Sequence, residues 1–281
     1  MDIQIALIVL LAALFHATWN AVVKSGVDHL LSITGLAVAS AILGLVILPI
    51  TGLPHKESWI YLFISAVLHF GYYIALSEAY RLSDFSQAYP IARGTAPIIV
   101  TLWSFFFLSE SMSLLEIIAL AGVILGILIF VTRKFEHLTK DQSGLITALL
   151  TSCTIGGYTI ADGLGGRASN NVLGYMMVLH IVDGIPILIY TWCKRGSQGI
   201  ALMCGKWKPL FAGAALALIS YTLVIWAMTQ APIALVSALR ETSIVIAALI
   251  GAYFFKEPSG KRRILASIVI FISVALLSFE N

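Results

Sequence analysis

The chain has 281 residues, of which 59% are hydrophobic and 11% charged, with a formal net charge of +3 and a mean hydropathy of +0.97. A soluble domain carries about 25% charged and about 45–50% apolar residues. This composition therefore excludes a soluble enzyme, a nucleic-acid-binding domain and a disordered chain. The three cysteines have no paired spacing, which argues against a disulfide framework and a CxxC metal site. The composition indicates an integral membrane protein.

Long apolar runs, separated by short polar or Pro/Gly breaks, follow one another along the whole chain. A membrane-spanning helix needs about 20 apolar residues, because about 30 Å of hydrocarbon is crossed at 1.5 Å per residue. The runs are solidly apolar rather than alternating, which favours helices over a membrane barrel. We therefore expect an all-α integral membrane protein with ten transmembrane helices, at 3–23, 30–50, 58–79, 86–108, 113–132, 143–163, 171–193, 208–229, 233–255 and 262–279.

Lysine and arginine are unevenly distributed between the two sides of these spans. The side that carries both termini has 2 of them and the other side has 13; with Arg93 and Arg240 inside spans, this accounts for all 17. Because positively charged loops remain in the cytoplasm, we expect both termini outside it. A compact chain without organelle signals fits a multi-pass protein of the bacterial inner membrane.

The sequence repeats itself weakly at an offset of 147 residues. Arg93 then falls on Arg240 and Glu110 on Glu257, and 8 of 27 aligned positions in this stretch are identical. Each half holds five spans, an odd number, so the second half must be inverted relative to the first. Inverted repeats are typical of secondary transporters, whose substrates bind between the halves near the bilayer midplane. We expect two inverted five-helix repeats, at 1–134 and 142–281.

A glutamate closes the fourth and the ninth span, in Leu108-Ser109-Glu110 and Phe255-Lys256-Glu257, and Trp19-Asn20 precedes Lys24 in the first span. With ten spans in two halves and short loops, these motifs resemble the drug/metabolite transporter superfamily, EamA type. The resemblance covers essentially the whole chain. It departs from the usual pattern at Asn20, where a glycine is common, and at Glu241, a charged residue directly after Arg240.

The resemblance implies a central cavity lined mainly by spans 3, 4, 8 and 9, and partly by spans 1 and 6. Members of the superfamily move amino acids, nucleotide sugars, sugar phosphates, quaternary amines and other small metabolites, so the resemblance does not supply the substrate. A further resemblance is to the branch associated with phosphonate utilisation. Glu110 and Glu257 are expected to fix the short connections rather than to contact substrate.

Charged residues inside the hydrocarbon are costly unless they are paired or hydrated, so each is a candidate for function. Arg93 lies about 10 Å from the cytoplasmic end of its span, and Arg240 lies equally far from the outer end of its own span. A guanidinium binds carboxylate, phosphate or phosphonate in bidentate fashion, and both arginines are candidate substrate ligands. The alternative is an internal ion pair, of Arg240 with Asp183 or Glu241, or of Arg93 with Glu78. Glu241 is likewise a candidate for binding a substrate amine or a coupling proton.

Four further polar residues of the spans are candidates for proton coupling: His16, His69, His180 and Asp183. Histidine titrates near physiological pH and suits a proton relay. The alternatives are interhelical hydrogen bonds or a zinc site. No compact ligand spacing supports the metal, so we expect neither a metal nor another cofactor.

Aromatic and small residues complete the candidates. Tyr73, Tyr158 and Trp226 are placed in the substrate site because aromatic rings stack on a ring or a quaternary amine; the alternative is a packing role. The first span adds Trp19 and Asn20. A GxxxG motif in the fifth span, Gly122 and Gly126, permits close helix packing within the monomer or in a homodimer.

We therefore expect a secondary transporter, not an enzyme, which moves a small anionic or zwitterionic metabolite by alternating access. Amino-acid-like, phosphonate-like and phosphate-like compounds are the expected substrates. No P-loop points to ATP. The alternatives are a flippase for lipid or polyprenyl phosphate, and a membrane-embedded hydrolase that uses the three histidines and Asp183. For the expected transporter, the partners are the lipid bilayer and the small-molecule substrate, and we expect no nucleic-acid partner.

Overall fold

A computed structural model describes residues 1–24, 28–82, 85–108, 110, 112–138, 142–246 and 261–276, and every regular element in them is helical. The chain is therefore all-helical in its described part. The elements, including a 3-10 turn (η1) and a π-helical turn (η2), are α1 (Ile3–Lys24), α2 (His29–Thr51), η1 (Lys56–Ser58), α3 (Trp59–Leu82), α4 (Phe85–Trp103), η2 (Ser104–Leu108), α5 (Leu114–Leu138), α6 (Gln142–Ala168), α7 (Val172–Cys204), α8 (Trp207–Gln230), α9 (Ile233–Arg240) and α11 (Lys261–Leu276).

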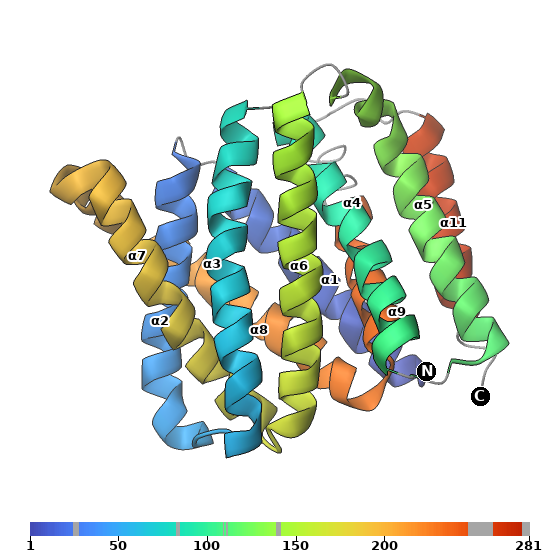
Figure 1. Ribbon diagram of the computed structural model, residues 1–281, viewed down its shortest axis with the longest axis horizontal. Helices are drawn as coiled ribbons and strands as arrows, with labels where there is room; N and C mark the ends of the chain where they lie inside the picture. Colours follow the sequence, from blue (N-terminus) through green and yellow to red (C-terminus); the bar gives the residue numbers. More distant parts are fainter. Residues whose placement is uncertain are drawn as a thin grey trace.

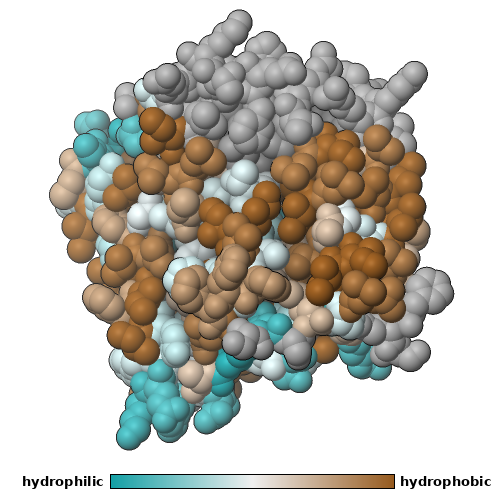
Figure 2. Space-filling model, turned by 45° about the vertical axis from the view of Figure 1, so that its right-hand side comes forward, coloured by the Kyte–Doolittle hydropathy of each residue, from teal (hydrophilic) through white to brown (hydrophobic). Residues whose placement is uncertain are grey.

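The surface of the molecule is suited to lipid. Among the described residues, four helices are long and apolar enough to cross a membrane: Leu30–Thr51, Lys56–Ala79, Val172–Cys204 and Trp207–Gln230. Shorter apolar helices lie at Ile3–Trp19, Ala92–Leu108 and Leu114–Ile129. Figure 2 shows hydrophobic side chains over much of one face, with hydrophilic ones mainly at its lower edge and at the upper left. Exposed apolar side chains on this scale are characteristic of a protein embedded in a bilayer.

The helices pack in pairs that join distant parts of the sequence. α2 lies along α7, α3 along α6, α1 along α8 and α5 along α11, while α4 packs against both α6 and α9. In Figure 1, α1 and α8 cross behind the more upright α2, α3 and α6. α6 contacts α3, α4, α7, α8 and α9 and so lies at the centre of the molecule.

Glycines explain why α6 can have so many neighbours. A Cβ added at Gly156 would lie 2.8 Å from Ile99 of α4, and one at Gly163 would lie 2.7 Å from Ile233 of α9. Such distances leave no room for a side chain. Small residues at helix contacts let backbones approach closely, which stabilises packing inside a membrane.

The GxxxG motif of α5 serves packing within the chain. A Cβ at Gly122 would meet the Ser273 hydroxyl of α11, and one at Gly126 would lie 2.5 Å from Ile270. Of the two uses expected for this motif, the structure therefore shows contact inside the monomer.

α2 and α7 are also tied together at one end. Asp28 accepts a hydrogen bond from the Leu31 amide, which caps α2, and its carboxylate lies 2.9 Å from Nε of Arg195. Partial burial raises the pKa of Asp28. Hydrogen bonds from backbone amides and from Arg195, together with the positive charge of Arg195, more than offset this effect, so the pKa lies below its ordinary value. α7 bends directly after Arg195, at Gly196 (φ 64°), a conformation that favours glycine. Helix resumes beyond this bend and ends at Cys204, so α7 extends past residue 193, where we expected the seventh span to end.

The ninth expected span, 233–255, is not one continuous helix. α9 ends at Arg240, Glu241 and Thr242 form a turn, and helix resumes at Ser243. Hydrogen bonds of the i to i−3 type replace i to i−4 bonds here, as from the amide of Glu241 to the carbonyl of Ala238 (3.1 Å). The expectation of a continuous helix was wrong because two adjacent charged residues are directed to different neighbours. Residues 247–260, including Glu257, lie outside the described part.

Candidate functional site

The break in the ninth span brings its two charged residues to the centre of the molecule. Glu241 Oε1 lies 2.8 Å from an Nη atom of Arg93 on α4, and both side chains are 3% exposed. The two residues belong to opposite halves of the sequence. Of the alternatives for Arg93, the structure therefore shows an ion pair, whose partner is Glu241.

Arg240 has aromatic neighbours in place of a carboxylate. Its guanidinium carbon lies 5.0 Å from the ring centre of Tyr221 on α8, in cation–π contact, and the guanidinium donates to the Tyr158 hydroxyl on α6. Within the described part of the chain, no carboxylate forms an ion pair with Arg240, and its buried Nε has no hydrogen-bond partner. The alternative for Arg240, an ion pair with Asp183 or Glu241, is thus absent from this geometry.

Asp162 of α6 is a central residue that the sequence argument did not select. It is 0% exposed, and its two carboxylate oxygens accept hydrogen bonds from Tyr175 (2.9 Å) and from Tyr221. A signal for it was available, because an acidic residue within an apolar run is costly and therefore a candidate for function. The same rule had selected Arg93 and Arg240.

His69 of α3 joins this centre on the other side. Its ring stacks on Tyr158 with 3.9 Å between ring centres. Nδ1 lies 3.0 Å from the Ser65 hydroxyl and 3.8 Å from Asp183 Oδ2. The structure therefore brings together two of the expected proton-coupling residues, His69 and Asp183.

The other two histidines lie at the edge of the centre. His16 packs edge-on against Trp19 in α1. His180 has a buried Nε2 for which the described part of the chain offers no hydrogen-bond partner. In the described ranges, no three His, Cys, Asp or Glu side chains are close enough to hold a metal ion. The zinc alternative for these residues and Asp183 therefore lacks a ligand set there.

The aromatic candidates separate into two groups. Tyr158 is buried between His69 and Arg240, and Tyr73 lies near it, 6.3 Å from His69 between ring centres. Trp226 is 37% exposed and is not part of this centre. The side chain of Asn20 lies outside the described part of the structure.

Several buried polar atoms in and around this centre have no hydrogen-bond partner among the described residues. Native proteins satisfy most such groups, so unpaired ones require an explanation. They include both donors and acceptors: Trp19 Nε1, Arg240 Nε, His180 Nε2, Thr222 Oγ1, Thr242 Oγ1, Glu241 Oε2 and Asp183 Oδ1. A polar molecule with both acceptor and donor groups would pair with such a set.

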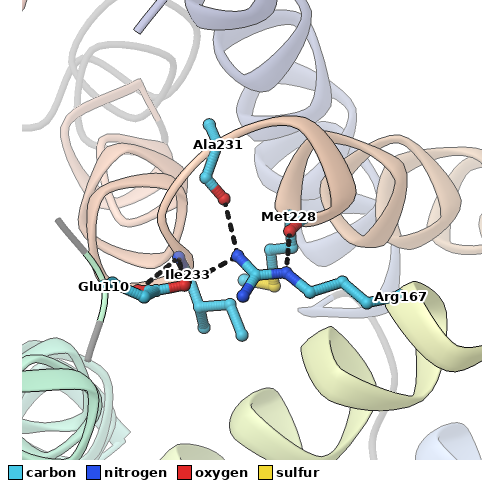
Figure 3. A network of polar contacts seen from close by, with 5 residues as sticks. All are labelled: Glu110, Arg167, Met228, Ala231 and Ile233. Atoms are coloured by element: carbon cyan, nitrogen blue, oxygen red, sulfur yellow. Dashed lines mark hydrogen bonds and ion pairs between the residues drawn. The ribbon is translucent and has the colours of Figure 1, made fainter. Parts of the chain in front are cut away.

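A second polar cluster lies near the C-terminal end of α6 (Figure 3). Arg167, near the end of α6, donates to the carbonyls of Met228 (2.8 Å) and Ala231 (3.0 Å) and to Glu110 (2.7 Å). The Glu110 carboxylate also accepts from the Ile233 amide and so caps α9. We call this cluster the Glu110–Arg167 bridge. The expectation that Glu110 fixes a connection agrees with these contacts.

Comparison with known proteins places this geometry in a family. The model of the EamA-like transporter family matches residues 3–132 and 142–279. The chain belongs to the EamA-like transporter family. It is accordingly a multi-pass membrane protein of a transporter family, as its apolar helices indicate.

One relative of this EamA-like transporter is named "Putative ribose uptake protein RbsU", from Lactobacillus johnsonii (strain CNCM I-12250 / La1 / NCC 533). The two are 25% identical over 228 residues, which make up 77% of this chain and 76% of the relative. A solved crystal structure matches 98% of this chain and 97% of its own, with a TM-score of 0.71 and 15% identity. At that identity the likeness concerns the fold alone.

Proposed function

We propose that this EamA-like transporter is a secondary transporter that carries a small anionic or zwitterionic metabolite, whose anionic group binds Arg240. The observation that carries the proposal is the contrast between the two central arginines. Glu241 neutralises Arg93, whereas Arg240 is 5% exposed and forms no ion pair with any described residue. A buried cation without a counter-ion is costly, and a substrate anion would offset that cost.

Helix packing supports the proposed inverted repeats. If each helix is exchanged for its counterpart five spans away, the α1–α8 contact becomes the α6–α3 contact and the α4–α6 contact becomes α9–α1. The α2–α7, α4–α9 and α5–α11 contacts map onto themselves. The two separate family matches agree with this division. We propose that the chain forms ten transmembrane helices in two halves of five, 1–134 and 142–281, with the second half inverted relative to the first. The two halves rock against each other about the central residues.

The Glu110–Arg167 bridge supports access that alternates between the two sides. It joins the end of the fourth span to the sixth, eighth and ninth, and so ties the proposed halves together at one end. By the distribution of lysine and arginine, this end faces outside the cytoplasm. In this conformation the bridge holds the outer side closed, and it must separate for the outer side to open.

The experiment is ligand-induced thermal stabilisation of the purified protein, compared with Arg240→Gln. A ligand raises stability by RT ln(1 + [L]/Kd), so even weak binding is measurable at high concentration. The probes are methylphosphonate and inorganic phosphate (anions), glycine (a zwitterion) and ribose (neutral). We expect anions or the zwitterion to stabilise the wild type and to lose this effect in Arg240→Gln. Arg195→Gln, which removes an arginine outside the centre, is the matched control and should respond like the wild type.

A neutral sugar is the second candidate substrate. The name of the RbsU relative states ribose uptake, and the rings of His69, Tyr158 and Tyr221 gather beside Arg240. Apolar faces of sugars pack on aromatic rings, and sugar hydroxyls pair with mixed donors and acceptors. Stabilisation by ribose alone, unchanged in Arg240→Gln, would overturn the anion proposal in favour of this one.

A further inference from the structure

Asp162 is a buried acidic residue whose presence is not explained by the binding of an anion at Arg240. It lies on the central helix α6 and is 0% exposed. Among the described residues, no lysine or arginine forms an ion pair with it, and its hydrogen-bond donors are the neutral hydroxyls of Tyr175, Tyr221 and Ser65. Burial of a carboxylate is costly without a compensating positive charge nearby.

One side chain connects Asp162 to Arg240. The Tyr221 hydroxyl donates to Asp162 Oδ2, while the face of the same ring contacts the Arg240 guanidinium at 5.0 Å. The two charges are therefore separated by a single phenol ring. Because Arg93 and Glu241 neutralise each other, Asp162 is the counter-charge available to Arg240 across that ring.

Other titratable and charged groups also act on Asp162. Side chains from several helices interact electrostatically with Asp162: Tyr73 of α3, Tyr175 and Asp183 of α7, Tyr221 of α8 and Arg240 of α9. From α4 the charged group of the centre is Arg93, which is paired. The Ser65 hydroxyl hydrogen-bonds to Asp162 and lies 3.0 Å from His69 Nδ1, so a polar chain leads from Asp162 through Ser65 to His69.

We propose that Asp162 takes up one proton when an anion binds Arg240, so that substrate and proton cross the membrane together. An anion at Arg240 adds a negative charge beside an ionised Asp162. One proton from water, forming an O–H bond on that carboxylate, restores the net charge of the buried centre. By linkage, the proton then favours the anion and the anion favours the proton to the same extent. The inference rests on the proposed function, because it needs an anion at Arg240.

The first test of the inference needs no substrate. Infrared difference spectra on acidification are recorded for the protein in phosphatidylethanolamine/phosphatidylglycerol vesicles. We expect the carbonyl band of a protonated carboxyl in the wild type. The band should be lost in Asp162→Asn, which keeps the size and polarity of the side chain, and kept in the matched control Glu116→Gln, which removes a buried carboxylate outside the centre. An Asp162→Asn spectrum identical to that of the wild type would overturn the inference.

The second test measures the coupling with methanesulfonate, an anion that does not itself titrate in this range. Its affinity for the wild type should increase on acidification, by at most about tenfold per pH unit for one linked proton. In Asp162→Asn the affinity should be high and independent of pH. If Arg240→Gln abolishes binding but Asp162→Asn keeps the pH dependence of the wild type, the inference fails and the proposed function stands. If no anion stabilises the wild type, both fail.

Tyr221→Phe provides a second variant in case Asp162→Asn does not fold. It keeps the ring beside Arg240 and removes one hydrogen-bond donor to Asp162. We expect the frequency of the carboxyl band to shift. A band that is unmoved in this variant assigns the titration to another carboxyl and overturns the inference.

Discussion

Arg93 and Arg240 occupy equivalent positions in the two halves of the sequence but have different surroundings. Arg93 meets the Glu241 carboxylate, whereas Arg240 meets the rings of Tyr158 and Tyr221. The sequence predicted both as equal candidates because the same residue type recurs at the same spacing. It could not assign their partners, since Arg93 and Glu241 are far apart in the chain. Side-chain pairing between distant helices has no local signal.

The Arg93–Glu241 pair leads to a prediction about stability. Removing one partner of a buried ion pair leaves the other charge without its counter-ion, at a cost of about 3–5 kcal/mol. We expect Arg93→Gln and Glu241→Gln each to lower the free energy of unfolding by such an amount in the same detergent. The double variant should recover most of the loss, because both charges are then absent. Costs that simply add would show that the two side chains do not interact.

Asp162 and Tyr221 show what the sequence argument missed. A single aspartate in an apolar run is a recognisable signal. Gly156 and Gly157 lie in the same span, and nothing in the sequence assigns them a role. The structure gives those glycines a packing role, against Ile99 and Leu68. Tyr221 carries no such signal, because an aromatic residue at helical spacing is most often part of the core.

At the scale of the elements, apolar run length predicts the helix starts well. α1 to α8 begin within one residue of the expected positions, because composition changes sharply where the chain enters hydrocarbon. The break after Arg240 was not predicted. Hydropathy averages over a whole span, and the turn at Glu241 and Thr242 depends on contacts with α4 and α8 rather than on a proline or glycine there.

The Glu110–Arg167 bridge gives a prediction about α9. Glu110→Gln keeps one acceptor for the Ile233 amide but loses the charge that pairs with Arg167 and caps the helix. A charge-assisted hydrogen bond is stronger than the neutral one that remains in the variant, by about 1–2 kcal/mol. We therefore expect amide hydrogen exchange of a peptide over 228–240 to be about five- to thirtyfold faster.

Glu116→Gln is the matched control for this measurement. Glu116 pairs with the amino group of Met1 at 2.8 Å, so the control removes a buried carboxylate elsewhere. It should leave exchange in 228–240 unchanged. Equal acceleration in both variants would mean that the bridge has no specific hold on α9.

At the scale of the whole molecule, the orientation in the membrane is open to a direct test. In a variant whose three cysteines are replaced by serine, Lys56→Cys and Lys206→Cys place single thiols at exposed positions on the two predicted sides. A membrane-impermeant maleimide should label Lys56→Cys in intact cells and Lys206→Cys only after permeabilisation, because the lysine- and arginine-rich side is cytoplasmic. The reverse pattern would place both termini in the cytoplasm.

The class of the molecule, the places where helices begin and the family resemblance could all be read from the amino-acid sequence, and the family match confirms the resemblance. These follow from local composition, because about 20 apolar residues in a row partition into a bilayer wherever they occur. Only the tertiary structure decided that Glu241 pairs with Arg93, that Tyr221 links Arg240 to Asp162, and that Arg167 meets Glu110. The pairs Arg93–Glu241, Asp162–Tyr221 and Glu110–Arg167 each join residues more than 50 positions apart. The contact between Tyr221 and Arg240 depends on the same helix packing. Their physical reason is the packing of whole helices, which brings costly buried charges to the partners that offset them.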